Sequence, residues 1–249
     1  MKIDTSTTQN YQQLASMQKI NSASDNPAGS AISEKLENQA TGTKQGTENT
    51  ENMQNVVQTA EGALSSVQDQ LQQMRELTLQ ASNGSLTQSD RQSIQSEIDG
   101  IKESINEVGE NTQFNSQNLL DGSFQDKQVA SNADGSGSEL SMGEISTSSL
   151  GVDSIDVTEN ADIAKVDDAL EQVSEARNKL GSEYNGLEYS ADVNRINRYN
   201  TISANSRIED ANPAQEITEL QKKEALEQYQ NFAQMEEQNQ QESILNVIS

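Results

Sequence analysis

The sequence predicts a mainly α-helical protein: a long antiparallel helical rod, packed as a coiled-coil-like bundle, with a small β-hairpin region and terminal helices that order on assembly. Three observations lead to this prediction. Apolar residues recur at helical spacing in three stretches. A stretch rich in Gly, Ser, Asn and Asp interrupts them. Both ends carry too few large apolar side chains to bury themselves without a partner.

The first apolar stripe runs from Met53 to Met74 and predicts a long helix that packs against others. Steps of four and three residues alternate along it, through Met53, Val57, Ala60, Leu64, Val67, Leu71 and Met74. This is a heptad pattern, which is typical of a coiled-coil interface. Ile32 and Leu36 would extend this stripe towards the N-terminus, but residues 38–52 between them and Met53 are too polar to establish that extension.

A polar turn separates the first stripe from the second. Within residues 81–90, Gly84 fits a helix C-cap. Thr87 and Asp90 fit a capping box that starts the next helix. The second stripe then consists of Ile94, Ile98, Ile101, Ile105 and Val108. Two such helices joined by a short loop form an antiparallel hairpin.

The third stripe lies in the C-terminal half and predicts one helix from about 163 to 210. Its apolar residues are Ile163, Val166, Leu170, Val173, Leu180, Tyr184, Leu187 and Ala191, with a less regular continuation to Ile208. At 1.5 Å per residue this helix extends roughly 70 Å, so a rod is the expected architecture. Residues 109–162 contain many turn residues and short alternating pieces such as ELSMGEI and SIDV, which predict β-hairpins or turns that cap the rod.

Composition argues against several functional classes. The formal net charge of −24 disfavours nucleic acid and anionic membrane surfaces as partners. The chain contains no Cys and no His, so the sequence offers no thiol nucleophile, imidazole base or usual zinc site. Its carboxylates are scattered along polar helix faces, and no apolar run reaches membrane-spanning length. We therefore expect a protein that is not an enzyme, has no cofactor and does not insert into membranes.

The N-terminal residues 1–13 lack the apolar centre of a secretory signal. A secreted form of this protein would then need an export route without a cleaved signal.

The only two prolines of the chain stand near its two ends in similar motifs, SDNPAGSAI and DANPAQEI. Asn26 and Asn212 fit helix N-caps, whose side chains accept hydrogen bonds from the first turn. Pro27 and Pro213 fit the first helical position, which needs no N–H. Because the residue before a proline disfavours the helical conformation, both motifs predict a boundary between two helices.

Seven blocks of the chain match the motifs of one known family. Four of them are INSASDNPAGSAI at residues 20–32, QTAEGALSSVQDQLQQMRELTLQASNG at 58–84, SIQSEIDGIKESINEVGENTQFNSQNLLDG at 93–122 and SRIEDANPAQEITELQKKEALEQ at 206–228, and the other three lie at residues 147–157, 163–189 and 243–249. In sequence and in order these blocks resemble bacterial flagellin, the subunit of the flagellar filament. The resemblance covers nearly the whole chain and implies a short form without large outer variable domains.

The family's organisation implies three regions for this chain. Residues 1–26 would form an N-terminal inner-core segment and residues 212–249 a C-terminal inner-core helix. Residues 27–211 would form the helical rod domain, with its β-rich part at about 109–162. The two Asn-Pro motifs, Asn26–Pro27 and Asn212–Pro213, would then lie where the chain crosses between the inner core and the rod.

The resemblance implies a structural subunit that self-assembles into the filament for motility and is secreted to the extracellular bacterial flagellum. A hook-filament junction (hook-associated) protein is the alternative, and a free-standing coiled-coil scaffold would show the same heptads. The implied partners are further copies in a helical homopolymer, hook-associated and cap proteins, and an export chaperone.

The resemblance also implies recognition by Toll-like receptor 5. In the family two facing helices form the recognised surface, and Arg75, Glu76, Leu77 and Glu97 fall on matching positions. Gln73 stands where the family normally has a basic residue. A neutral amide cannot supply the forked charged donor of arginine, so we expect weak activation of the receptor.

The chain departs from the family pattern in three places. The segment before Ile20 is shorter than usual, so the pairing of terminal helices is expected to be lopsided. Many positions in residues 222–242 that are usually Ala or Leu are Glu or Gln here. Ser116 stands where the family usually has glycine.

Overall fold

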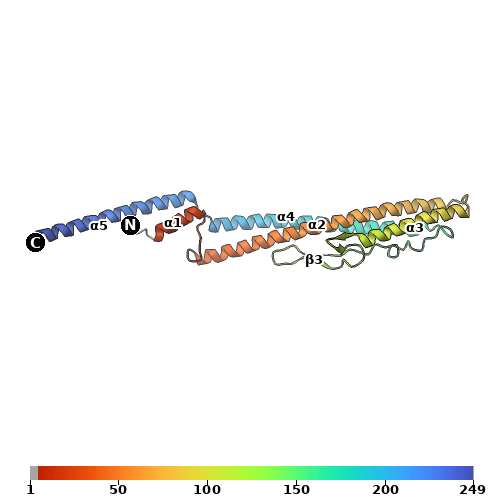
Figure 1. Ribbon diagram of the computed structural model, residues 1–249, viewed down its shortest axis with the longest axis horizontal. Coiled ribbons are helices and arrows are strands. Elements are labelled where there is room, and N and C mark those ends of the chain that lie inside the picture. The colour runs from red at the N-terminus through yellow and green to blue at the C-terminus, as the bar shows by residue number, and fades with distance from the viewer. Residues whose placement is uncertain (1–4, 249) are drawn as a thin grey trace. The chain divides into compact units, whose positions relative to one another are not determined.

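The computed structural model describes the backbone of residues 5–248 and the side chains of residues 11–241. Five helices and two short β-hairpins are present in this part of the chain (Figure 1). They are α1 (Thr5–Ser16), α2 (Pro27–Ala81), α3 (Gln88–Asn111), β1 (Gln113–Phe114), β2 (Gln117–Asn118), β3 (Lys127–Ala130), β4 (Gly137–Leu140), α4 (Ile163–Glu209) and α5 (Pro213–Ile248). The expected mainly helical fold with a small antiparallel β region is confirmed.

The chain divides into two compact units. A terminal unit comprises Met1–Ala40 and Arg198–Ser249, and a central unit comprises Thr41–Asn197. Both boundaries fall inside helices, one in α2 and one in α4, and not at the two prolines. The three regions expected from the sequence concern the layers of an assembled filament, and they stay a prediction.

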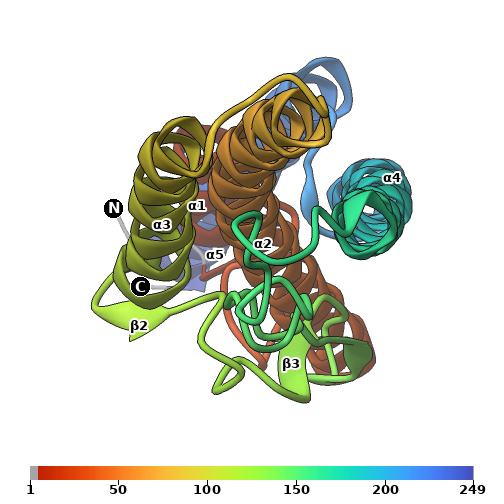
Figure 2. The same ribbon diagram turned by 90° about the vertical axis from the view of Figure 1, so that its right-hand side faces the viewer.

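The core of the central unit lies between its three helices. Seen end-on, α2 lies between α3 and α4 (Figure 2). Most residues of the three apolar stripes are buried there, as their spacing predicts. Met53, Val108, Leu170 and Tyr184 are only partly buried and pack against the edge of the core.

The connection between α2 and α3 confirms one expected cap and contradicts the other. Thr87 and Asp90 form the capping box, because the Asp90 N–H donates to the Thr87 hydroxyl and the Thr87 N–H donates to the Asp90 carboxylate. Gly84, however, is not the C-cap of α2. The helix ends at Ala81, and Gly84 does not adopt the left-handed conformation that makes glycine useful at that position.

The β region lies along the helices and does not cap their end. Asn106 of α3 accepts a hydrogen bond from Thr147, and Lys102, one turn earlier, donates to the backbone of Asp153. Leu120, Phe124, Val129, Leu140, Met142, Ile145, Leu150, Val152, Ile155 and Val157 are buried in this region. The segment thus closes the open side of the three-helix core.

The strands themselves are shorter than the alternating sequence suggests. β1 and β2 form one antiparallel hairpin, and β3 and β4 form another. Of the piece ELSMGEI, only its first two residues lie in β4, and SIDV contributes a single isolated bridge between Asp156 and Asn160. The apolar side chains of these pieces are buried by irregular backbone, so alternation alone overestimates strand length.

The polar first half of α2 is helical because the β3–β4 hairpin packs against it. The Thr47 and Thr50 hydroxyls are buried and donate to carbonyls one turn earlier, which satisfies them within the helix. Gly46 leaves room for the hairpin, since an added Cβ would lie 2.0 Å from the Ser131 carbonyl oxygen. Asn194 of α4, also buried, donates to the same carbonyl oxygen at 2.6 Å.

Candidate assembly and recognition surfaces

Both Asn-Pro motifs begin helices in the terminal unit. The Asn26 Oδ1 accepts from the Gly29 N–H at 2.9 Å, and α2 starts at Pro27. The Asn212 Oδ1 accepts from the Ala214 N–H at 3.1 Å, and α5 starts at Pro213. The expected capping is therefore confirmed, while a place between two filament layers stays a prediction for both motifs.

Backbone hydrogen bonds tie the segments before these two helices to each other. The Lys19 N–H donates to the Glu209 carbonyl at 2.6 Å, and the Ala211 N–H donates to the Met17 carbonyl at 3.0 Å. Gln18 and Asp210 form an isolated antiparallel bridge between these two bonds. The N-terminal and C-terminal parts of the chain thus meet at one junction within the terminal unit.

The Glu209 carboxylate is the polar centre of this junction. Its Oε1 accepts from the Gln18 amide at 2.8 Å. Its Oε2 accepts from the Ser33 hydroxyl at 2.9 Å and from the Asn205 amide at 3.0 Å. One carboxylate therefore connects the N-terminal segment, α2 and the end of α4. Sequence reasoning missed this role; the only signal was the position of Glu209 inside the SRIEDANPA block.

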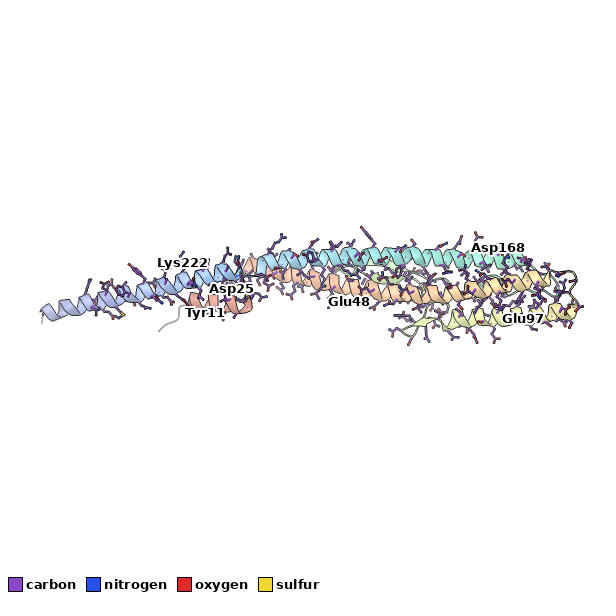
Figure 3. The ribbon with its side chains drawn as sticks, turned by 90° about the horizontal axis from the view of Figure 1, so that it is seen from above. Tyr11, Asp25, Glu48, Glu97, Asp168 and Lys222 are labelled. Atoms are coloured by element: carbon purple, nitrogen blue, oxygen red, sulfur yellow. The ribbon has the colours of Figure 1, made fainter. Side chains whose placement is uncertain are left out.

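The two terminal helices pack against each other, but they differ greatly in length. α1 has 12 residues and α5 has 36. The Tyr11 hydroxyl donates to the Glu224 carboxylate at 2.9 Å, and this bond raises the pKa of Tyr11. Tyr11 on α1 and Lys222 on α5 are labelled in Figure 3. A one-to-three ratio of lengths leaves most of α5 without a helix against it within the described chain.

α5 exposes a row of large apolar side chains beyond this contact. Leu226, Tyr229, Phe232 and Met235 follow at steps of three residues and are all more than half exposed. Each step of three residues turns by about 60°, so the four side chains wind around about half of the α5 surface. Four large exposed apolar side chains within ten residues mark an interaction surface.

The five residues expected to form a receptor surface lie on different sides of α2 and α3. Arg75 is directed to α4, where its Nε donates to the Asp167 carboxylate at 2.6 Å, and this bond raises the pKa of Arg75. Leu77 is half-buried against the core. Residues two positions apart on a helix are separated by about 200° of rotation. Arg75 and Leu77 therefore point in nearly opposite directions.

The remaining three residues of the expected surface are exposed. Gln73 and Glu76 lie on α2 and Glu97 lies on α3. In Figure 3, Glu97 and Asp168 of α4 lie on opposite sides of α2. Arg75 pairs with Asp167, the residue next to Asp168 on α4. The Arg75 guanidinium is thus separated from Glu97.

The described residues show no cluster of three or more acidic side chains arranged to hold a metal ion. Likewise, no helix in the searched part of the chain is both long and apolar enough to cross a bilayer. The geometry described above is that of interaction surfaces.

Two family models cover most of the chain. The model of the bacterial flagellin N-terminal helical region matches residues 2–125. The model of the bacterial flagellin C-terminal helical region matches residues 163–248. The chain belongs to the bacterial flagellin family. The two matched regions contain all five helices, and the unmatched residues are those of the β3–β4 region and the loops that follow it.

Curated flagellins resemble the chain over nearly its whole length. A flagellin of Halalkalibacterium halodurans is 32% identical over 95% of this chain and 90% of its own length. A flagellin of Bacillus subtilis is 31% identical over 96% and 91%. A flagellar filament core protein of Brachyspira hyodysenteriae is 32% identical over 91% and 86%. The chain is thus a structural subunit of a bacterial flagellar filament.

Solved structures agree with this fold. The crystal structure of a Bacillus cereus flagellin is 25% identical, with a TM-score of 0.50 over 59% of this chain and 88% of that one. A putative flagellar hook-associated protein of Vibrio parahaemolyticus has a TM-score of 0.60 over 75% and 100%, at 19% identity. At that identity the second likeness concerns the fold alone, and it does not favour the hook-filament junction alternative over the filament subunit.

Proposed function

We propose that this filament subunit polymerises through the apolar surface of α5, which becomes buried only against neighbouring copies. The observation that carries the proposal is the row from Leu226 to Met235 on a helix three times longer than its partner α1. Contacts between different surfaces of identical subunits produce an open helical filament and not a closed ring. The terminal helices would therefore order fully on assembly.

Removal of residues 241–249, QESILNVIS, tests this proposal together with a double substitution. We expect Tyr229→Ser with Phe232→Ser, like the truncation, to leave the central unit folded by circular dichroism but to abolish sedimentable filaments. Gln230→Ser, at an exposed position of α5 with no apolar group to lose, is the matched control and should polymerise normally. Filaments of normal yield from the double variant would contradict the proposal for this row, and filaments of normal yield from the truncated chain would contradict a role for the end of α5.

Family membership also supports a proposal about the finer partners. We infer that an export chaperone covers the apolar C-terminal helix before secretion. Hook-associated and cap proteins would contact the two ends of the extracellular filament. The exposed apolar row on α5 supports a chaperone, because exposed apolar side chains on an unassembled subunit invite premature association.

We further propose that Toll-like receptor 5 is activated only weakly by this chain. Two features support the proposal: Gln73 carries no charge, and the Arg75 guanidinium is already bound to Asp167. In a reporter-cell titration Gln73→Arg should lower the half-maximal concentration, whereas Gln72→Arg, one position away around the helix, should not. Full potency of the unmodified chain would overturn this proposal.

A further inference from the structure

The chain contains two Asn-Gly pairs, and they lie in different backbone conformations. Asn83 and Gly84 lie in the connection between α2 and α3, whereas Asn185 and Gly186 lie in the middle of α4. All four residues are exposed. An Asn-Gly pair can deamidate without an enzyme, because the glycine nitrogen attacks the asparagine side-chain amide and no Cβ hinders its approach. The backbone conformation therefore decides which pair reacts.

The connection between α2 and α3 leaves the reacting groups of the first pair unbound. It lies at the common end of the two helices (Figure 1). Neither the Gly84 N–H nor the Asn83 Nδ2 forms a hydrogen bond with another residue of the described chain. A Cβ added at Gly84 would have nothing within 4 Å. The attacking nitrogen and the leaving amide group are thus both accessible to solvent.

Ser85 polarises the side-chain carbonyl of Asn83. Its N–H donates to Asn83 Oδ1 at 3.1 Å, and its hydroxyl donates to the same atom at 3.0 Å. Negative charge develops on this oxygen when a nucleophile attacks Cγ, and two donors already in place stabilise that charge. The backbone is held as well, since the Leu86 N–H donates to the Asn83 carbonyl at 3.2 Å and closes a turn around Gly84 and Ser85.

The helical conformation of α4 protects the second pair. In an α-helix the N–H of residue 186 bonds to the carbonyl of residue 182, so it is not available for attack. The Cα–Cβ bond of a helical residue also tilts towards the helix N-terminus, which turns the Asn185 side chain away from the N–H that follows it. Both pairs are exposed, so solvent access does not distinguish them.

Two other turns show that a carboxylate fits the arrangement at Asn83. Residues 121–123 and 134–136 both read Asp-Gly-Ser, in place of the Asn-Gly-Ser at residues 83–85. In both, the aspartate Oδ1 accepts from the serine hydroxyl at 2.6 Å and from the serine N–H, at 2.9 and 3.0 Å. The serine hydroxyls lower the pKa of Asp121 and Asp134. The donors of Ser85 are therefore suited to hold a carboxylate at position 83.

We propose that Asn83 is a self-modification site, at which the folded chain converts its own asparagine into an aspartyl or isoaspartyl residue. The Gly84 nitrogen forms a bond to Asn83 Cγ and gives its proton to a solvent base. The Cγ–Nδ2 bond then breaks, and ammonia leaves with a proton taken from water. Water opens the resulting cyclic imide at either carbonyl, and no oxidant, reductant or cofactor is consumed.

The modification makes the charge of the connection between α2 and α3 depend on the age of the chain. The amide at position 83 is neutral, and the carboxyl group that replaces it is ionised at neutral pH. This inference goes beyond the filament function and does not depend on it, because every group that takes part belongs to one copy.

Peptide mapping by mass spectrometry tests the proposal on the full-length chain. The folded protein and the protein unfolded in urea are incubated at the same mildly alkaline pH, and conversion at residues 83 and 185 is followed with time. In the folded chain residue 83 should convert at least about tenfold faster than residue 185, because only its reacting groups are positioned for attack. In urea this ratio should collapse.

Three results of this experiment would overturn the proposal. Equal rates at the two residues in the folded chain would mean that the turn confers no reactivity. Slower conversion of residue 83 in the folded chain than in urea would mean that the turn protects it. A ratio that persists in urea would assign the difference to neighbouring side chains and not to the fold.

Substitutions at Ser85 test the polarising donors. Ser85→Ala removes the hydroxyl and keeps the N–H, so conversion of residue 83 should slow by about two- to tenfold, as for the loss of one hydrogen bond. Ser85→Thr should restore the rate. Ser82→Ala is the matched control, because the Ser82 hydroxyl donates to the Thr78 carbonyl and not to Asn83. An unchanged rate in Ser85→Ala, or equal slowing in Ser82→Ala, would overturn the role of Ser85.

Discussion

At the scale of single residues, Ser116 shows what a departure from the family pattern does to the backbone. Asn115 and Ser116 connect β1 to β2 and have φ angles of 47° and 63°. Two positive φ values in a two-residue hairpin loop define a type I′ turn, in which glycine is favoured at the second position. The side chain of Ser116 therefore holds a conformation that is unfavourable for a residue with a Cβ.

We predict that Ser116→Gly raises the free energy of unfolding by about 1 kcal/mol, because glycine removes the steric cost of this turn. Chemical denaturation of the monomer, followed by circular dichroism, measures the change. Ser96→Gly, at an exposed position of α3, should instead destabilise by about 0.5 kcal/mol through the lower helix propensity of glycine. A loss of stability for Ser116→Gly would show that the hydroxyl makes a contact worth more than the strain.

The two glycines at residues 46 and 62 of α2 allow a second test at this scale. An added Cβ at Gly46 would meet backbone at 2.0 Å, whereas nothing lies within 4 Å of a Cβ at Gly62. Gly46→Ala should therefore destabilise by about 1–3 kcal/mol as the hairpin is displaced. Gly62→Ala should stabilise by up to about 1 kcal/mol through helix propensity. Thermal melting of both variants gives the comparison, and equal effects would mean that the hairpin moves away freely.

Local signals in the sequence predicted the details that depend on neighbouring residues. Asn26, Asn212 and Thr87 could be assigned as caps, because each contacts a backbone group within three residues. The direction of Arg75 could not be assigned in this way. It depends on Asp167, which is 92 residues away in the sequence.

At the scale of elements, the contribution of an ion pair between helices to stability depends on how deeply the pair is buried. Arg177 of α4 donates twice to Glu61 Oε1 of α2, at 2.6 and 2.8 Å, and also to Gln68. Its side chain is 31% exposed, against 45% for Arg75 in the pair with Asp167. The Glu61 Oε2 is buried and lacks a hydrogen-bond partner among the described residues.

We predict that Arg177→Met destabilises the central unit by about 1–3 kcal/mol, since it leaves the Glu61 carboxylate half-buried without its donor. Arg75→Gln should cost less than about 1 kcal/mol, as is typical of an exposed pair. Urea denaturation of the two variants side by side tests the order. The reverse order would mean that the Arg75–Asp167 pair is stronger than its exposure suggests.

The bounds of α3 and α4 were predictable to within a few residues, since a stripe of apolar side chains repeated every three to four residues indicates a buried helix face directly. The first half of α2 was not predictable in the same way. It is stabilised by the packing of a distant hairpin on Gly46 and by Thr hydroxyls that bond within the helix. The β region was overestimated because buried irregular backbone also produces apolar alternation.

At the scale of the whole molecule, the charge decides how assembly responds to salt. The formal net charge is −24, and α5 alone has seven carboxylates and two lysines. Copies of such a chain repel each other over about 10 Å at 0.1 M ionic strength, the Debye length, and over about 3 Å at 1 M. The apolar row proposed for contact on α5 gains nothing from ionic attraction.

We therefore predict that the critical concentration for polymerisation falls steeply as sodium chloride is raised from about 50 mM to about 1 M, because screening removes repulsion and leaves apolar burial unchanged. Sedimentation at a series of protein concentrations measures it at each salt concentration. The chain lacking residues 241–249 is the control: it carries one carboxylate fewer, E242, and should stay in the supernatant throughout. A critical concentration that rises with salt would mean that ion pairs hold the subunits together, and the apolar surfaces would then not be the principal contacts.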